Sequence, residues 1–193
     1  RHGHRPRGSR DRSGMITRRI PNTDLELSAV GFGCWAIGKT YWGNDVDDAT
    51  SADAIRAALE VGINWFDTAP LYGEGHADRI LANALGQDKH RVVIASKVGV
   101  RFEGLEHAQS FLDPAWLERD TEASLRRLGV DCIDLLQVHW PCESDTPLDS
   151  TLACLVRLRD SGKIRYFGLC NYPAKDVVEA AKVDGMVSLQ TPY

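Results

Sequence analysis

GINWFDTAPLYG, residues 62–73, combines a short apolar run with a polar loop that contains a tyrosine. Its first part, residues 63–68, contains the apolar Ile63, Trp65 and Phe66, and we expect it to be a strand in a parallel sheet whose two faces are both covered. Apolar residues at helical spacing precede this run over residues 48–61 and follow it over residues 75–85. A strand between two helices predicts one repeating unit of an α/β fold.

The same alternation continues along the rest of the chain. Turn-forming residues separate further apolar runs, and these predict strands at residues 30–35, 92–98, 133–139, 164–169 and 186–190. Helical spacing of apolar residues predicts further helices at residues 114–128, 147–161 and 174–183. Asp113 before Pro114 and Thr146 before Pro147 predict N-caps with a proline in the first helical position.

Six parallel strands joined by helices predict an α/β architecture, the (β/α)8 or TIM barrel. Residues 16–27 alternate around turn formers and predict a hairpin that caps the barrel, so the chain covers this hairpin and strands 1 to 6 only. A complete barrel needs about 250 residues, whereas this chain has 193. We therefore expect it to be part of a longer polypeptide, because without closure its first and last strands have unpaired edges.

Composition divides the chain into two parts. Residues 1–14 are rich in Arg, Gly and Ser, and we expect a disordered basic leader or a cloning remnant there. Residues 15–193 form the incomplete barrel domain. With 43% hydrophobic and 26% charged residues, the chain falls among ordinary globular proteins.

Several classes of function are disfavoured by the sequence. No apolar run approaches the roughly 18 residues of a membrane span, and no secretory leader is present, so a cytoplasmic protein is expected. Outside the leader the chain is acidic, which disfavours nucleic acid as a partner. The five cysteines, which include Cys142, lack Cys-x-x-Cys spacing and are expected to be reduced thiols. No metal site is expected, and the sequence leaves the oligomeric state open.

Ionisable side chains follow the ends of consecutive predicted strands: Asp67 and Tyr72 the second, Lys97 the third and His139 the fourth. Each alone has an ordinary structural explanation, such as a turn residue or a buried histidine. In a parallel barrel, however, the carboxyl ends of all strands meet at one mouth, so these four residues are expected to lie together.

The four side chains together predict an acid catalyst. A phenol with a pKa of about 10 is a poor proton donor unless a nearby cation favours its ionised form. Lys97 can supply that cation, and Asp67 can hold and orient the ammonium. A neutral His139 would donate a hydrogen bond to an oxygen that gains charge as hydride arrives. Such a site reduces a carbonyl group.

These residues lie in motifs that are similar to those of a known family. GINWFDTAPLYG resembles the signature of the aldo-keto reductases, in particular the bacterial NADP-dependent members. LRRLGVDCIDLLQVHWP at residues 125–141, GKIRYFGLCNY at 162–172 and the terminal SLQTPY resemble later motifs of the family, in the same order. The resemblance spans residues 16–193.

The resemblance implies reduction of a small-molecule carbonyl substrate by NADPH. It implies Tyr72 as the proton donor of a catalytic set with Asp67, Lys97 and His139. Cofactor contacts are implied for Cys34, Trp35, Asp67, Cys170, Asn171 and Gln190, and substrate contacts for Trp35, Leu71, Tyr72, His139 and Trp140. Asn171 and Gln190 match positions that bind the nicotinamide carboxamide. Cys170 replaces the usual serine, which predicts an altered nicotinamide contact because a thiol is a weak hydrogen-bonding group.

Other interpretations stay open at this point. GFGCWA, residues 31–36, resembles a dinucleotide-binding glycine motif only weakly, because glycines and aromatic residues follow it where a helix is needed. The chain could instead belong to a non-catalytic, cofactor-sensing subunit, or to an NAD-dependent sugar dehydrogenase. Aromatic residues favour an apolar substrate cleft, and the candidates are Trp35, Tyr41, Trp42 and Trp140.

Overall fold

The main sheet of the protein is built from parallel strands. The structure is a computed structural model that describes residues 9–10, 14–39, 45–102, 107–141 and 146–192. The strands of this sheet are β4 (Phe32–Gly33), β5 (Trp65–Asp67), β6 (Val93–Val98), β9 (Ile133–Val138), β10 (Ile164–Cys170) and β11 (Met186–Gln190). They lie side by side in chain order, and every neighbouring pair is parallel. This arrangement confirms the predicted barrel topology for its first six strands.

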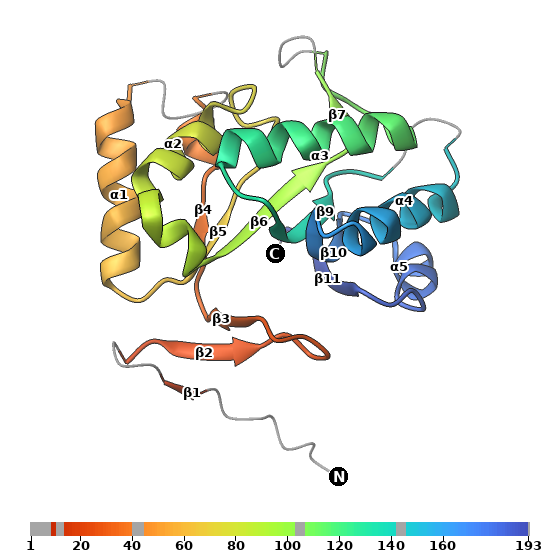
Figure 1. Cartoon of the computed structure of the whole chain (residues 1–193), viewed down its shortest axis with the longest axis horizontal. Coiled ribbons are helices and arrows are strands. Elements are labelled where there is room, and N and C mark those ends of the chain that lie inside the picture. Colours follow the sequence, from red (N-terminus) through yellow and green to blue (C-terminus); the bar gives the residue numbers. More distant parts are fainter. Residues whose placement is uncertain (1–8, 11–13, 40–44, 103–106, 142–145, 193) are drawn as a thin grey trace.

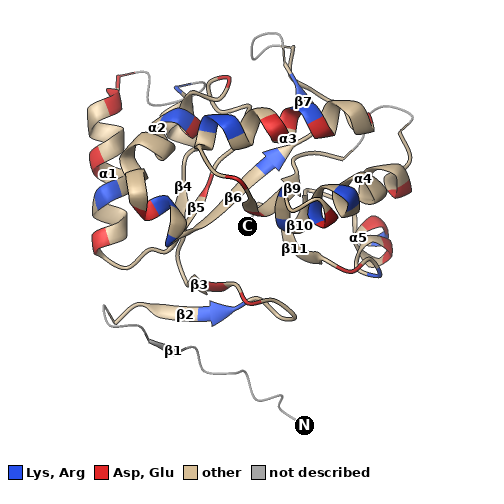
Figure 2. Cartoon of the chain, in the orientation of Figure 1, with Lys and Arg blue, Asp and Glu red and all other residues tan. Residues whose placement is uncertain are grey.

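One helix follows each of the first five strands of this sheet. The helices are α1 (Asp48–Glu60), α2 (His76–Leu85), α3 (Pro114–Leu128), α4 (Leu148–Asp160) and α5 (Ala174–Ala180). They lie along one side of the curved sheet (Figure 1). Charged residues are frequent on the helices and fewer on the strands of the main sheet (Figure 2). None of the described helices is long and apolar enough to cross a bilayer.

The core lies between the sheet and this layer of helices. Phe66, Leu136 and Phe167 on three strands are fully buried, and Leu117 and Leu155 on the facing helices are buried with them. Burying such a side chain contributes about 1.5 to 3 kcal/mol. The apolar strands and the apolar faces of the helices therefore fix which side of each element faces inward.

Helix ends follow the sequence closely at α3 and less closely elsewhere. The Asp113 carboxylate accepts a hydrogen bond from the Trp116 backbone N–H at 3.0 Å, which confirms the expected N-cap. The predicted cap at Thr146 is wrong, because Pro147 is extended at ψ 144° and is itself the residue before α4. The predicted helix over residues 174–183 ends earlier, at Ala180.

A hairpin covers the amino ends of the strands, as predicted. It consists of β2 (Ile16–Arg19) and β3 (Glu26–Ser28), which pair antiparallel. Asp24 in its turn accepts hydrogen bonds from Arg165 at 2.5 Å and from the Tyr166 hydroxyl at 3.0 Å, so the hairpin is tied to β10. A further strand, β1 (Ser9–Arg10), pairs antiparallel with β2.

The first predicted strand is shorter in the structure than expected. The strand expected at residues 30–35 is shortened to β4, and Trp35 lies instead in a 3-10 helix, η1 (Trp35–Gly38). Pairing ends where the Cys34 N–H donates to the Asp67 carbonyl at 2.8 Å, and the chain then turns away from the sheet.

Other short elements were not predicted at all. The sequence missed a hairpin of β7 (Val100–Arg101) and β8 (Gln109–Ser110), because strands of two residues show no periodicity. It also missed a second 3-10 helix, η2 (Gly86–His90). Tyr41 and Trp42, which were expected to help form an aromatic cleft, lie outside the described residues.

Candidate active site

The carboxyl ends of β5, β6 and β9 bring together the four ionisable residues. Asp67 ends β5, Lys97 lies one residue before the end of β6, and His139 directly follows β9. Tyr72 lies in the segment between β5 and α2, which we call the Tyr72 loop (residues 68–75). Because these strands are neighbours in one parallel sheet, side chains far apart in sequence meet at one edge.

Lys97 and Asp67 form a buried ion pair. The Lys97 Nζ lies 2.6 Å from both carboxylate oxygens of Asp67 and 3.4 Å from the Thr68 carbonyl oxygen. Burial by itself lowers the pKa of the Lys97 ammonium, but Asp67 and Tyr72 beside it raise that pKa overall. Lys97 is therefore held as a cation.

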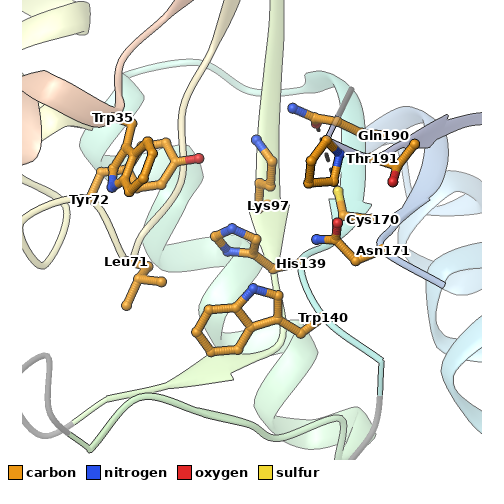
Figure 3. A pocket seen from close by; sticks show the side chains of 11 residues that line it. Trp35, Leu71, Tyr72, Lys97, His139, Trp140, Cys170, Asn171, Gln190 and Thr191 are labelled. Carbon is orange, nitrogen blue, oxygen red and sulfur yellow. Dashed lines mark hydrogen bonds between the residues drawn. The ribbon is translucent and has the colours of Figure 1, made fainter.

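Tyr72 lies next to this cation. The Lys97 Nζ is 5.7 Å from the centre of the Tyr72 ring, and the hydroxyl is directed toward the lysine (Figure 3). Burial raises the pKa of the Tyr72 phenol above its ordinary value, while Lys97 acts in the opposite direction. The prediction that Lys97 makes this phenol acidic is therefore corrected, because burial outweighs the ammonium and the net shift of the Tyr72 pKa is upward.

His139 faces Tyr72 across the site. Its ring lies 6.0 Å from the Tyr72 ring at an interplanar angle of 81°, and 5.3 Å from the ring of Trp140. Burial, together with Lys97, lowers the pKa of His139 to about 3. The imidazole is therefore neutral at physiological pH and keeps one N–H as a hydrogen-bond donor.

A cavity of about 390 Å³ opens in front of these side chains (Figure 3). Its lining residues are Trp35, Leu71, Tyr72, Lys97, His139, Trp140, Cys170, Asn171, Gln190, Thr191 and Pro192. Apolar side chains form most of its wall, and the ring of Trp35 is 44% exposed at its rim. Such a cavity can hold a flat, partly apolar molecule beside a small set of polar groups.

Most of the expected cofactor and substrate residues reach this cavity, but two do not. Cys34 is fully buried and does not line it, and Asp67 contributes only through Lys97. Thr191 and Pro192 line the cavity although they were not selected from the sequence. They follow Gln190 in SLQTPY, so extending that motif by two residues would have found them.

The far wall of the cavity carries carboxamide side chains. Asn171 has a left-handed backbone, with φ 62°, and its N–H donates to the Gln190 carbonyl at 2.9 Å. The Cys170 thiol donates to the Gln190 Oε1 at 3.7 Å, and burial raises the pKa of this thiol to about 12. Two carboxamides offer the donors and acceptors that an amide such as nicotinamide requires, so these residues fit that group.

The part of the chain that the structure describes shows neither a disulfide nor a metal site beside this cluster. There, Cys34, Cys132, Cys154 and Cys170 are free thiols, and Cys142 lies outside the described residues. Among these same residues, no group of three His, Cys, Asp or Glu side chains is placed to hold a metal ion. The candidate active site is therefore the cluster of Tyr72, Lys97, Asp67 and His139.

Curated proteins with similar sequences include an aldo-keto reductase and a methylglyoxal reductase. The chain is 37% identical over 179 residues to the aldo-keto reductase YhdN of Bacillus subtilis (strain 168), covering 90% of this chain and 52% of that protein. It is 34% identical over 191 residues to the NADH-specific methylglyoxal reductase of Escherichia coli (strain K12), covering 91% and 59%. The chain thus spans little more than half the length of these relatives.

Solved structures give the same result for the fold and the family. The aldo-keto reductase AKR11C1 from Bacillus halodurans in its holo form matches with a TM-score of 0.83 at 33% identity, covering 93% of this chain and 58% of that one. An aldo-keto reductase from Klebsiella pneumoniae in complex with NADPH matches with a TM-score of 0.74 at 28% identity, with the same coverage of 93% and 58%. The model of the Aldo/keto reductase family matches residues 29–193. The chain therefore belongs to the aldo/keto reductase family.

Proposed function

We propose that the full-length protein is an oxidoreductase that reduces aldehydes or ketones to alcohols with a nicotinamide dinucleotide. One observation carries the proposal: a buried ammonium, Lys97, is held by both oxygens of Asp67 at 2.6 Å beside the phenol of Tyr72. Nothing about stabilising a fold requires a phenol, a cation and a neutral imidazole around one open cavity. Proton transfer to a substrate oxygen does require them.

The reduced nicotinamide, when bound, supplies the hydride to the carbonyl carbon. Tyr72 gives its phenolic proton to the carbonyl oxygen, which becomes the hydroxyl of the alcohol. Lys97 stabilises the phenolate that remains, and Asp67 keeps the ammonium in place. Neutral His139 donates a hydrogen bond that orients the carbonyl and stabilises charge developing on its oxygen.

Burial explains why Tyr72 needs the cation. A phenol that is raised in pKa by burial holds its proton firmly between catalytic events. Lys97 becomes important only as the proton leaves, because the phenolate then lies beside an ammonium in a site of low polarity. The arrangement favours the transition state over the resting state, which is the requirement for catalysis.

The walls of the cavity indicate the cofactor and the substrate class. Asn171 and Gln190 would hold the nicotinamide carboxamide, and Trp35 offers an apolar surface at the rim. Leu71 and Trp140 favour apolar or medium-sized aldehydes. We propose NADPH as the hydride source, because the Klebsiella relative is in complex with NADPH. The NADH-specific Escherichia coli relative makes NADH the alternative that must be tested.

The proposal is tested by mixing the full-length protein with a panel of aldehydes and either NADPH or NADH. We expect loss of cofactor absorbance matched by formation of the alcohol, with a higher kcat/KM for NADPH. Turnover with NADH alone would overturn the choice of cofactor. Binding of either nucleotide without any turnover would favour the non-catalytic, cofactor-sensing alternative and overturn the proposed reaction.

A further inference from the structure

A buried carboxylate lies behind the candidate active site without touching its cavity. Asp78, in the first turn of α2, is completely buried. Its Oδ1 accepts a hydrogen bond from the Thr68 hydroxyl at 2.8 Å, and its Oδ2 accepts one from the Arg127 Nε, also at 2.8 Å. The proposed reaction gives Asp78 no part, so this network calls for a separate explanation.

Thr68 connects Asp78 to the ion pair of the active site. It directly follows Asp67 and is completely buried. Its hydroxyl donates to Asp78, while its carbonyl oxygen lies 3.4 Å from the Lys97 Nζ. The bond between Thr68 and Asp78 therefore joins the start of the Tyr72 loop to the helix that follows the loop.

Arg127 supports the same loop from the neighbouring helix α3. Its side chain lies against Gly75, where a Cβ atom would be 2.4 Å from both the Cδ and the Nε of the arginine. Gly75 also has a φ of 76°, a left-handed conformation that glycine adopts without strain. The Nη2 of Arg127 donates to the Ser124 hydroxyl at 2.9 Å, which fixes the guanidinium on its own helix. The end of the Tyr72 loop thus rests on Arg127.

Hydrogen bonds within the loop transmit these two constraints to Tyr72. The Tyr72 N–H donates to the Ala69 carbonyl at 3.0 Å, and the Gly75 N–H donates to the Pro70 carbonyl at 2.7 Å. With the loop held at Thr68 and Gly75, these bonds leave its backbone few alternatives. The position of the phenol relative to Lys97 therefore depends on both ends of the loop.

Stability alone is a weak reason for such a network. Replacing a buried ion pair by well-packed apolar residues is often neutral or stabilising, whereas removing one partner is costly. Burial raises the pKa of the Asp78 carboxyl, and Arg127 and Thr68 act to lower it, so the charged form depends on these two partners. Burying the charges of this network costs free energy, so the network is better explained by the geometry of the Tyr72 loop that it specifies.

We propose that Asp78 and Arg127 are positioning residues, which set the place of Tyr72 beside the catalytic cation by closing the Tyr72 loop through Thr68. This inference rests on the proposed reductase function. It predicts a defect in the chemical step when the closure is broken, with cofactor binding preserved, because the network does not reach the cavity.

The test uses Thr68→Val in the full-length protein, which removes the hydroxyl and keeps the shape of the side chain. We expect kcat to fall by about tenfold or more, since small misplacements of reacting groups have effects of this size. The cofactor Kd should not change, and Thr68→Ser should restore kcat. The alkaline limb of the pH profile of kcat should move to higher pH, because a displaced phenol gains less from Lys97 and holds its proton longer.

Thr121→Val is the matched control. Thr121 is also completely buried and its hydroxyl also donates a short bond, but to the Leu117 carbonyl at 2.7 Å within α3 and not to Asp78. The Thr121→Val variant should lose about as much free energy of unfolding as Thr68→Val, and it should keep the kcat and the pH profile of the parent. If Thr68→Val does not fold, Arg127→Lys is measured in its place. The Arg127 side chain is 20% exposed, and lysine keeps the positive charge at this position.

The outcomes separate this inference from the proposed function. An inactive Tyr72→Phe with a parent-like kcat and pH profile in Thr68→Val and Arg127→Lys would overturn the positioning role alone. A fully active Tyr72→Phe would overturn both. A stability loss in Thr68→Val equal to that in Thr121→Val, with kcat unchanged, would show a merely structural threonine and would also contradict the inference.

Discussion

Asp67 and Lys97 come from neighbouring strands, and the Lys97 Nζ lies 2.6 Å from each carboxylate oxygen of Asp67. The exposed fractions of the two side chains are only 12% and 2%. In such a place each charge depends on the other, because water cannot replace a lost partner. The pair therefore affects both the stability of the protein and the acid chemistry of Tyr72.

The first prediction concerns the stability of this pair. Asp67→Asn should lower the free energy of unfolding by about 3 to 5 kcal/mol, because it leaves a buried ammonium without its counter-charge. Urea denaturation of the full-length protein measures the change. The double variant Asp67→Asn with Lys97→Met should recover part of the loss. A single variant within about 0.5 kcal/mol of the parent would contradict a coupled buried pair.

The second prediction concerns His139 and pH. Because its pKa is lowered to about 3, kcat/KM should show no titration of this histidine between roughly pH 5 and 8. The depressed pKa also means that the folded state binds fewer protons than the unfolded state below about pH 6.5. Stability linked to His139 is thus present above that pH and is lost as the pH falls toward 3.

The pH profile of kcat/KM, compared between the parent and His139→Gln, tests this prediction. The variant should lower the rate at every pH without moving the acidic limb. A limb near pH 6.5 in the parent that disappears in His139→Gln would mean that the imidazole titrates there. It would contradict the assignment of His139 as a neutral hydrogen-bond donor.

The third prediction concerns Cys170 and the nicotinamide contact. The thiol donates only a weak bond of 3.7 Å to Gln190, and a hydroxyl in its place would donate a shorter and stronger one. Cys170→Ser should therefore orient the Gln190 side chain more firmly and lower the cofactor Kd by a few-fold. Fluorescence titration of the full-length protein measures this constant. An unchanged Kd would remove the idea that the cysteine alters the contact.

The fourth prediction concerns Asp120, a half-buried carboxyl on α3. Burial raises the pKa of Asp120 to about 6, against a contribution from the Gly99 N–H that lowers it. A raised pKa stabilises the folded state below the unfolded value of about 3.8, and this contribution is lost as the pH rises through about 6. Asp120→Asn should therefore increase stability at pH 7 by roughly 2 kcal/mol.

Thermal or urea unfolding at several pH values checks the Asp120 prediction. Between about pH 4 and 6 the parent loses stability as the pH rises, and the free energy of unfolding of Asp120→Asn should depend less on pH in this range. The control for a simple change in net charge is Asp131→Asn, because the Asp131 carboxyl is exposed and lies just beyond the same helix. An Asp120→Asn protein that is less stable than the parent at pH 7 would contradict a carboxyl that is costly to ionise.

The sequence predicted the site better than it predicted the environment of the site. Asp67, Tyr72, Lys97 and His139 could be found because parallel strands place their carboxyl ends at one edge, and strand order follows from apolar runs. The pKa of Tyr72 could not be found, because it depends on how deeply the ring is buried. A residue's type and spacing carry no such information.

The network behind the site was also invisible in the sequence. Asp78 shares the buried face of α2 with Leu81 and Leu85, but the spacing of residues within α2 does not show which cation faces it. Only the packing of α2 against α3 brings Asp78 and Arg127 together, with Gly75 leaving space for the arginine. Trp35 was placed in a strand for the same reason, since pairing beyond Cys34 is decided by the neighbouring strand rather than locally.

Tyr72 is assigned the role of proton donor in the proposed reaction. Single-turnover hydride transfer in the full-length protein, measured by rapid mixing after NADPH is bound, tests it most directly. Tyr72→Phe should slow this step by about 100-fold or more, whereas Tyr166→Phe, whose hydroxyl bonds Asp24 near the amino end of β10, should leave it unchanged. Hydride transfer at the parent rate in Tyr72→Phe would show that Tyr72 is not the proton donor.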